Sequence, residues 1–161
     1  MFGQFFDTQD GSTAGKSGGV TMIHQSELNF MTPDEARAFF AGDRYATEVT
    51  GIFIEDCGTH YAKCSLSLRP DHRNAVGQVM GGVLFTLADF TFAVAANNGG
   101  VPTVTAVSQI TFLSPVRGEK LFAETTLIKD GKRSCHYLIE ITDDQDTLVA
   151  TVSSTGMHLN N

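Results

Sequence analysis

The chain has 161 residues, of which 42% are hydrophobic and 18% are charged, and its formal net charge is −7. That length allows one domain with a proper core and is too short for two domains of ordinary size. The acidic balance argues against nucleic acid and against an anionic membrane surface as partners, because binding to phosphate depends on Lys and Arg. No apolar run reaches the ~20 residues that a membrane helix needs, so we expect a soluble protein.

The cysteines and histidines predict neither disulfides nor a metal site. The cysteines form an odd set without a Cys-x-x-Cys pair, and the histidines show no metal-binding spacing. The first residues of the chain lack the basic start and the apolar stretch of a secretory signal. We therefore expect reduced thiols in a cytoplasmic protein that uses no metal and no other cofactor.

The chain begins with an aperiodic stretch rich in Gly, Ser and Thr over residues 1–26. We interpret it as a flexible arm that precedes a single domain at 27–161. The first element of that domain is a helix predicted over 31–42. Thr32 suits its N-cap position, and Glu35 completes a capping box.

Alternating apolar and polar residues predict the strands. The stretches 47–55 and 61–68, separated by turn-like residues 56–59, predict an antiparallel hairpin. A long apolar helix is predicted next, over 82–97. The remaining strands have turn residues between them, including an Asp-Gly pair typical of hairpins, and they cover 103–113, 120–129, 134–143 and 147–158. This order predicts an α+β fold in which an antiparallel sheet wraps around one long central helix.

One carboxylate interrupts the apolar helix predicted over 82–97. Asp89 is the only ionisable residue between Gly82 and Asn98. A helix that is apolar on nearly every side belongs inside a protein. A buried carboxylate there costs several kcal/mol unless it is paired or hydrogen-bonded, so we expect Asp89 to be kept for a chemical purpose.

The residues before Asp89 supply groups that can act on a carbonyl. A glycine pair, Gly81-Gly82, at a helix start lets backbone N–H groups approach a ligand without interference from a Cβ. Those N–H groups have no partner within the helix and can form an oxyanion hole. Asn74 adds an amide upstream, and Asp89 lies about two turns further along roughly the same face. Together these groups fit attack on a carbonyl by water or by the carboxylate.

The spacing Asn-x-x-Gly-x-x-x-Gly-Gly from Asn74 to Gly82, followed by an apolar helix with Leu-Ala-Asp ending at Asp89, resembles a known family signature. It is the signature of hotdog-fold acyl-CoA thioesterases of the phenylacetate-degradation (PaaI-like) type. The stretch 104–115 also resembles the strand that follows the helix in that family. The resemblance extends over about 47–158 and implies hydrolysis of an acyl- or aryl-CoA thioester to a free acid and coenzyme A.

The same resemblance implies roles for individual residues. Asp89 would be the nucleophile or the general base, and Asn74 and the Gly81 N–H would polarise the thioester carbonyl. Thr105 stands where a hydroxyl residue helps to position water. In that family the active site lies between two subunits, so Asp89 would face the partner's Asn74 and Gly81. Two such dimers commonly form a homotetramer.

One residue departs from the family pattern. The position before the glycine pair is often His in that family, whereas here it is Met80, which cannot donate a hydrogen bond or carry a proton. We keep Met80 and its neighbour Gly82 as candidate substrate-binding residues. The departure also leaves a second function open, that of a non-catalytic acyl-CoA-binding or scaffolding module.

Coenzyme A is polyanionic, so an acidic protein needs local cations to bind it. Arg73 precedes the motif and is our candidate for the phosphates, although other basic residues near the strand ends can serve equally, and all of them can be ordinary surface charges. The many Phe residues indicate an apolar acyl pocket. The acyl group, and its delivery by coenzyme A or by a carrier protein, stay open.

Each candidate residue also has a structural explanation. Asn74 can cap a turn, and the glycine pair, Gly81-Gly82, can exist for close helix packing. Asp89 can be held by backbone amides, and a Thr on a strand, such as Thr105, is often purely structural. The occurrence of all of them at the family spacing favours the catalytic interpretation.

Overall fold

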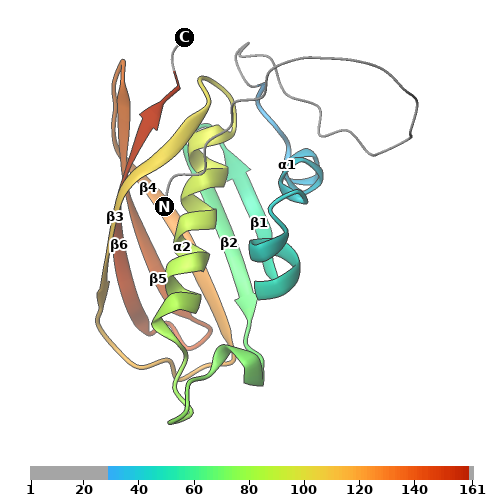
Figure 1. The fold of residues 1–161 in the computed structure, drawn as a ribbon, viewed down its shortest axis with the longest axis vertical. Helices are drawn as coiled ribbons and strands as arrows, with labels where there is room; N and C mark the ends of the chain where they lie inside the picture. The colour runs from blue at the N-terminus through green and yellow to red at the C-terminus, as the bar shows by residue number, and fades with distance from the viewer. Residues whose placement is uncertain (1–28, 160–161) are drawn as a thin grey trace, which may run out of the picture.

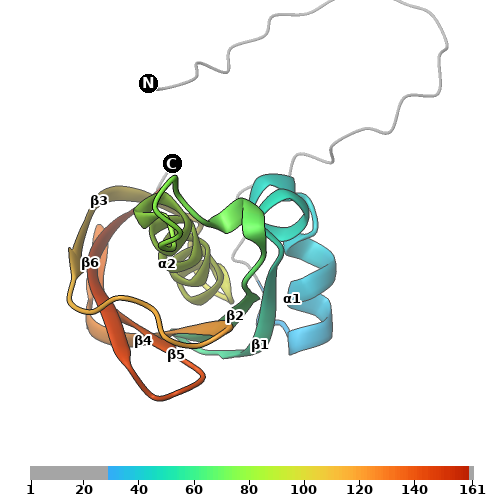
Figure 2. The same cartoon turned by 90° about the horizontal axis from the view of Figure 1, so that it is seen from below.

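The computed structural model describes residues 29–159. Within that range one antiparallel sheet, with the strand order β1-β2-β4-β5-β6-β3, curls around helix α2 (Gly81–Asn97), as Figures 1 and 2 show. The strands are β1 (Ile52–Gly58), β2 (Tyr61–Ser67), β3 (Thr103–Phe112), β4 (Lys120–Asp130), β5 (Ser134–Asp143) and β6 (Leu148–His158). This arrangement confirms the predicted hotdog fold.

Two other expectations concern the N-terminal arm and membrane-spanning helices. The arm predicted over 1–26 lies outside the described residues, so the boundary between arm and domain stays a prediction. Among residues 29–159, no helix combines the length and the apolar character that crossing a membrane requires.

The hydrophobic core lies between α2 and the concave face of the sheet. Leu87, Phe92 and Val94 of α2 are buried against side chains of the central strands. The Phe92 ring meets the Tyr137 ring of β5 edge-on, with 5.5 Å between the ring centroids. Burial of each large apolar side chain contributes about 1.5–3 kcal/mol, so this contact surface fixes the helix on the sheet.

The structure corrects the expectation that α2 is enclosed on every side. A curved sheet covers one side of a helix, and no part of residues 29–159 covers the opposite side of α2. Gly82 on that side is exposed, and Phe85, Thr86 and Asp89 are only half-buried. The sequence shows that the helix is apolar all round, but it does not distinguish burial by the sheet from burial by another molecule.

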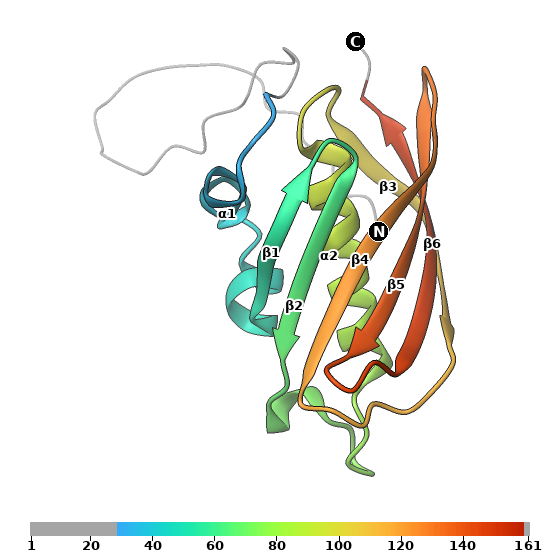
Figure 3. The same cartoon turned by 180° about the vertical axis from the view of Figure 1, so that it is seen from behind.

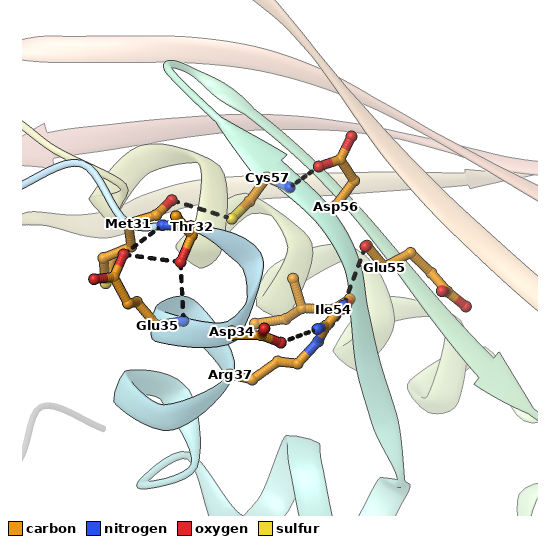
Figure 4. A network of polar contacts seen from close by, with 9 residues as sticks. All are labelled: Met31, Thr32, Asp34, Glu35, Arg37, Ile54, Glu55, Asp56 and Cys57. Atoms are coloured by element: carbon orange, nitrogen blue, oxygen red, sulfur yellow. Dashed lines mark hydrogen bonds and ion pairs between the residues drawn. The ribbon is translucent and has the colours of Figure 1, made fainter.

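Helix α1 (Pro33–Phe40) lies beside the edge strand β1, and its N-terminal cap follows the prediction, although the helix ends two residues before the predicted Gly42 (Figure 4). The Thr32 backbone N–H donates to the Glu35 carboxylate at 2.8 Å, and the Glu35 N–H donates to the Thr32 hydroxyl at 3.4 Å. Arg37 reaches the edge of β1, where its Nε donates to the Ile54 carbonyl at 2.9 Å. This side of the sheet is therefore covered.

The strand predicted over 47–55 is partly wrong. Its first half forms a π-helical turn, Tyr45–Thr50, which ends where the Gly51 N–H donates to the Ala46 carbonyl at 3.0 Å. Gly51 has a φ of 86°, a left-handed conformation that glycine adopts readily. Alternation over a few residues does not separate a strand from a single helical turn. Strand β1 therefore begins only at Ile52. It runs to Gly58, so the hairpin turn lies at residues 59–60 instead of 56–59.

Strand β3 forms the other edge of the sheet, and Figures 1 and 3 show its outer side uncovered. It pairs with β6 only, so its outer backbone groups have no strand partner among residues 29–159. Val104, Val107 and Phe112 on this strand are exposed. A long apolar edge strand of this kind is a template for pairing with another chain.

A buried carboxylate, Asp143, closes the end of the sheet where β5 turns into β6. One of its oxygens accepts hydrogen bonds from the N–H groups of Arg117 and Gly118, and the other accepts from Gln145 and Thr147, at 2.9–3.1 Å. Burial raises the pKa of Asp143, but these four donors outweigh it and lower the pKa to about 2. The loop before β4 is thereby fastened to the β5–β6 turn.

Candidate functional site

The structure brings Asp89 of α2 and Thr105 of β3 into contact. The Thr105 hydroxyl donates a hydrogen bond to the Asp89 carboxylate, with 3.1 Å between Oγ1 and Oδ1. The chain reaches this position because Asn97, at the end of α2, accepts from the Thr103 N–H at 2.8 Å and so directs β3 back along the helix. The β3–β6 register shifts between Thr105 and Val107. Such bulges re-aim side chains and are common beside active sites.

A cavity of about 520 Å³ lies next to Asp89, between α2 and the segment that follows α1. Asp43 lines it, and the pKa of Asp43 is raised by burial and by the nearby Asp89 carboxylate. Tyr45, Thr86 and Phe90 also line this cavity. We call the group formed by Asp89, Thr105 and Asp43 the carboxylate site. The sequence carries no signal for Asp43, because its proximity to Asp89 arises only from the tertiary fold.

A second group, which we call the glycine site, lies at the start of α2 and comprises Asn74, Met80, Gly81 and Gly82. The N–H groups of Gly81 and Gly82 make no hydrogen bond to any residue within 29–159, whereas the Val83 N–H donates to the Met80 carbonyl at 3.0 Å. These two N–H groups are therefore available to a ligand. The positive end of the helix dipole favours negative charge beside them.

The two glycines differ in what surrounds them. A Cβ added to Gly81 would lie 2.8 Å from Cζ of Phe112, so close packing alone accounts for this glycine. A Cβ added to Gly82 would meet no atom of the described chain within 4 Å. Glycine inside a helix costs about 0.5–1 kcal/mol relative to alanine. No contact within residues 29–159 offsets that cost at Gly82.

An apolar cavity of about 390 Å³ opens beside Gly81. It lies between the start of α2 and the segment that follows β3. Its walls are largely aliphatic and aromatic, which suits an apolar ligand group. The apolar residues that line it are Val79, Leu84, Phe112, Leu113, Pro115, Val116 and Val149.

Asn74 and Met80 are exposed at the glycine site. The side-chain oxygen of Asn74 accepts hydrogen bonds from the N–H groups of Val76 and Gln78, at 3.1 and 3.0 Å, so Asn74 does cap its own turn. The amide nitrogen of Asn74 has no partner among residues 29–159. The Met80 side chain is 45% exposed. A turn-capping role for Asn74 is thus compatible with donation to a ligand.

The loop before the glycine site is held by His72 and Arg73. The buried His72 ring accepts from the Arg69 N–H at 3.1 Å, and the His72 carbonyl accepts from the Met80 N–H at 2.9 Å. Burial and the Arg69 guanidinium lower the pKa of His72. Arg73 donates to the Gly77 carbonyl at 3.2 Å and lies 3.6 Å from the Glu119 carboxylate. The Arg73 side chain is half-buried, and it is already paired with Gly77 of this loop and with Glu119, which precedes β4.

The two groups do not form one site within a single chain. Gly81 and Asp89 are eight residues apart on one helix, which corresponds to about 12 Å along its axis. A reacting carbonyl must lie about 3 Å from both its nucleophile and its oxyanion donors. The structure therefore brings Asp89 and Thr105 together and leaves Asn74, Gly81 and Gly82 apart from them.

Comparisons with known proteins agree with this fold. Residues 76–150 match the thioesterase superfamily. The chain is similar to the acyl-coenzyme A thioesterase PaaI of Escherichia coli K12, with 33% identity over 116 residues that span 71% of this chain and 82% of that protein. It is also 33% identical over 101 residues to a putative esterase of Archaeoglobus fulgidus, and that match spans 62% of this chain and 66% of the relative.

A solved structure of the E. coli PaaI protein, from the phenylacetic acid degradation operon, superposes on this chain with a TM-score of 0.73 and 28% sequence identity. The superposition covers 80% of this chain and 93% of that protein. The likeness thus includes the long helix and the sheet around it.

Proposed function

The chain belongs to the thioesterase superfamily as a PaaI-like hotdog thioesterase, and on that premise we propose that it hydrolyses acyl- or aryl-CoA thioesters. Water and the thioester would give a carboxylic acid and free coenzyme A. The observation that carries the proposal is the Thr105–Asp89 hydrogen bond beside a cavity, on a helix whose first N–H groups are unpaired.

In this reaction the unpaired N–H of Gly81 and the Asn74 amide would hold the thioester oxygen as it gains negative charge. Asp89 would either add to the carbonyl carbon or take the proton of a water molecule that adds to it. Thr105 would orient the carboxylate or that water. Collapse of the adduct breaks the C–S bond, and the thiolate of coenzyme A leaves and takes up a proton. Where Asp89 itself adds, this leaves a mixed anhydride, which a water molecule then hydrolyses to the free acid and the restored Asp89 carboxylate.

We propose further that the reacting groups come from two copies of this chain. Three features support a second copy. Gly81 and Asp89 are separated by about 12 Å along one helix. In addition, the space around Gly82 is open, and the edge strand β3 has no partner on its outer side among residues 29–159. A partner that packs on the open side of α2 would place the partner's Asn74 and Gly81 opposite Asp89. A homodimer, or a homotetramer of two such dimers, satisfies this arrangement.

A thiol-release assay over a panel of acyl-CoAs and aryl-CoAs tests the activity. We expect release of coenzyme A from at least one substrate, and loss of that release in Asp89→Ala with the fold and the oligomer unchanged. Full activity of Asp89→Ala would overturn the assigned role of Asp89. Tight binding without release by the native protein, over the whole panel, would instead favour the acyl-CoA-binding module that Met80 leaves open.

A mixing experiment tests the two-chain site. Asp89→Ala and Asn74→Ala proteins are purified, unfolded together and refolded. If Asp89 acts with the partner's Asn74, a mixed dimer has one site with both residues intact, and random mixing restores about a quarter of native activity. If both residues act from the same chain, no intact site forms and no activity returns.

The binding position of coenzyme A and the location of the protein in the cell belong to the same proposal. Arg73 remains our candidate for a phosphate contact, although a phosphate would have to compete with Glu119 for it. A cytoplasmic location is supported by the free state of Cys57, Cys64 and Cys135. Met80 would contribute only apolar contact to the substrate, because its thioether donates no proton.

A further inference from the structure

A second cluster of reactive side chains lies at the far end of α2 from the glycine site. The carboxylate of Asp130, the thiol of Cys135 and the imidazole of His158 place one ligand atom each within 4.8 Å of one another. His60 approaches the same carboxylate, with 3.8 Å between its Nε2 and Oδ2 of Asp130. All of these residues line a cavity of about 320 Å³. Neither the carboxylate site nor the glycine site uses them.

The hydrogen bonds around His158 hold its ring so that Nε2 is directed at the Asp130 carboxylate. The Thr103 hydroxyl donates its proton to the Val101 carbonyl at 2.9 Å, because a carbonyl only accepts. Nδ1 of His158, 2.8 Å from the same hydroxyl, must then be the donor to Thr103. In the neutral ring this leaves the lone pair of Nε2 facing Oδ1 of Asp130 at 3.1 Å. These two acceptors need either a proton on Nε2, as in a His158–Asp130 ion pair, or a metal ion that both atoms bind.

His60 is arranged in a similar way. Its Nδ1 is hydrogen-bonded to the Tyr137 hydroxyl at 3.1 Å, and its Nε2 is turned toward Asp130. Both histidines thus have Nδ1 fixed by a hydroxyl and Nε2 directed at the same carboxylate. Metal-binding histidines characteristically have their second nitrogen held in this manner. Cys135 is buried on the inner side of the cluster, and its thiolate together with the Asp130 carboxylate would balance a divalent charge.

We propose that Asp130, Cys135 and His158, with His60 as a fourth ligand, bind a divalent transition-metal ion of the zinc type. Thiolate, imidazole and carboxylate together are the ligand set of tetrahedral zinc. Neighbouring ligand atoms in such a site lie about 3.5 Å apart, so the cluster closes by roughly 1 Å on binding. The ion would join the β1–β2 turn, the end of β4, strand β5 and the end of β6. The ligands come from four separate elements, and no sequence spacing could therefore reveal them.

Cobalt titration of the full chain, after removal of metals with a chelator, tests this site. We expect one equivalent of Co²⁺ per chain, with the near-ultraviolet absorption of a thiolate–cobalt bond and the visible bands of tetrahedral geometry. Cys135→Ser should abolish the thiolate band, and His158→Gln should weaken binding. Thr103→Val, which removes the hydroxyl that holds His158 together with its bond to the Val101 carbonyl, should weaken Zn²⁺ binding about 10- to 100-fold.

Matched controls separate this site from surface binding and from the proposed hydrolysis. Cys57→Ser and His136→Ala change the same residue types outside the cluster and should bind Co²⁺ like the native protein. Asp89→Ala should bind it equally, whatever becomes of thioester release. Circular dichroism of each variant establishes that it is folded. Absence of the thiolate band in the native protein, its persistence in Cys135→Ser, or its loss in Cys57→Ser would each overturn the proposal.

Discussion

The Thr105 hydroxyl and the Asp89 carboxylate, sixteen residues apart in the chain, are joined by a hydrogen bond of 3.1 Å across the interface between β3 and α2. This bond fixes one oxygen of the carboxylate and leaves the other directed elsewhere. In the proposed hydrolysis, Thr105 therefore governs the orientation of Asp89, its access to water, or both.

Thr105→Val removes this bond with little change in side-chain volume. We expect the turnover number for the best acyl-CoA substrate to fall roughly 100-fold, because a displaced catalytic group loses rate steeply with distance. The thermal midpoint should change little, since the residue is exposed in the single chain. Thr126→Val, at an exposed position of β4, is the matched control and should retain native turnover. Equal turnover of the two variants would remove Thr105 from the site.

Gly82→Ala and Gly81→Ala separate the needs of the fold from those of the reaction. The Gly82 variant should gain about 0.5–1 kcal/mol in unfolding free energy per chain, because its Cβ meets no atom of the described chain. Gly81→Ala should gain less, because the Phe112 ring must turn away. Despite its gain, Gly82→Ala should lose thioester release or assembly, as measured by the thiol assay and by sedimentation. A Gly82→Ala protein with native activity and native assembly would show that neither a ligand nor a partner approaches this backbone.

The four backbone donors around Asp143 predict a loss of stability in acid. The folded pKa of about 2 lies below the ordinary value of 3.8, so the contribution of this carboxylate is complete above about pH 4 and disappears as the pH falls toward 2. Asp143→Asn should lower the unfolding free energy near neutral pH by about 2 kcal/mol. Urea titrations at several pH values measure both effects. Asp146→Asn, in the same turn, is the control and should unfold at the native midpoint.

His72 predicts a second pH dependence nearer to neutrality. Its pKa is lowered from the ordinary value of 6.5, so the unfolded chain binds a proton more readily than the folded chain. Stability is therefore complete above about pH 6.5 and declines as the pH falls through the lower folded pKa. The slope in this window is positive and stays below about 1.4 kcal/mol per pH unit, which is the limit for one whole proton. His72→Asn, which keeps an acceptor for the Arg69 N–H, should flatten the slope in this window; an unchanged slope would assign it to other groups.

Much of the fold follows from local sequence pattern. The capping box at Thr32 and Glu35, the apolar helix and the Asp130-Gly131 hairpin each rest on neighbouring residues, and each is confirmed. The stretch 47–50 was wrongly predicted to be a strand, because four alternating residues also suit one helical turn. The position of Gly51 decided the outcome, through a left-handed φ that sequence alone does not show.

The site depended more on tertiary placement. The glycine pair and Asp89 lie on one helix, so their relation could be judged from helical spacing. Thr105 entered only through the family resemblance, because no periodicity tells which residue of a strand meets which residue of a helix. Asp43 had no signal at all, since its approach to Asp89 depends on how the chain leaves α1. The sequence likewise predicted no gathering of Asp130, Cys135 and His158, which are ligand types from different elements.

The length of helix between Gly81 and Asp89 has a kinetic consequence. If one chain supplies the oxyanion donors and another supplies the carboxylate, a correctly folded single chain is inert. Specific activity should then depend on protein concentration, falling on dilution below the dissociation constant of the dimer and returning on reconcentration. Any molecule that occupies the open side of α2 would switch the enzyme off without touching its substrate.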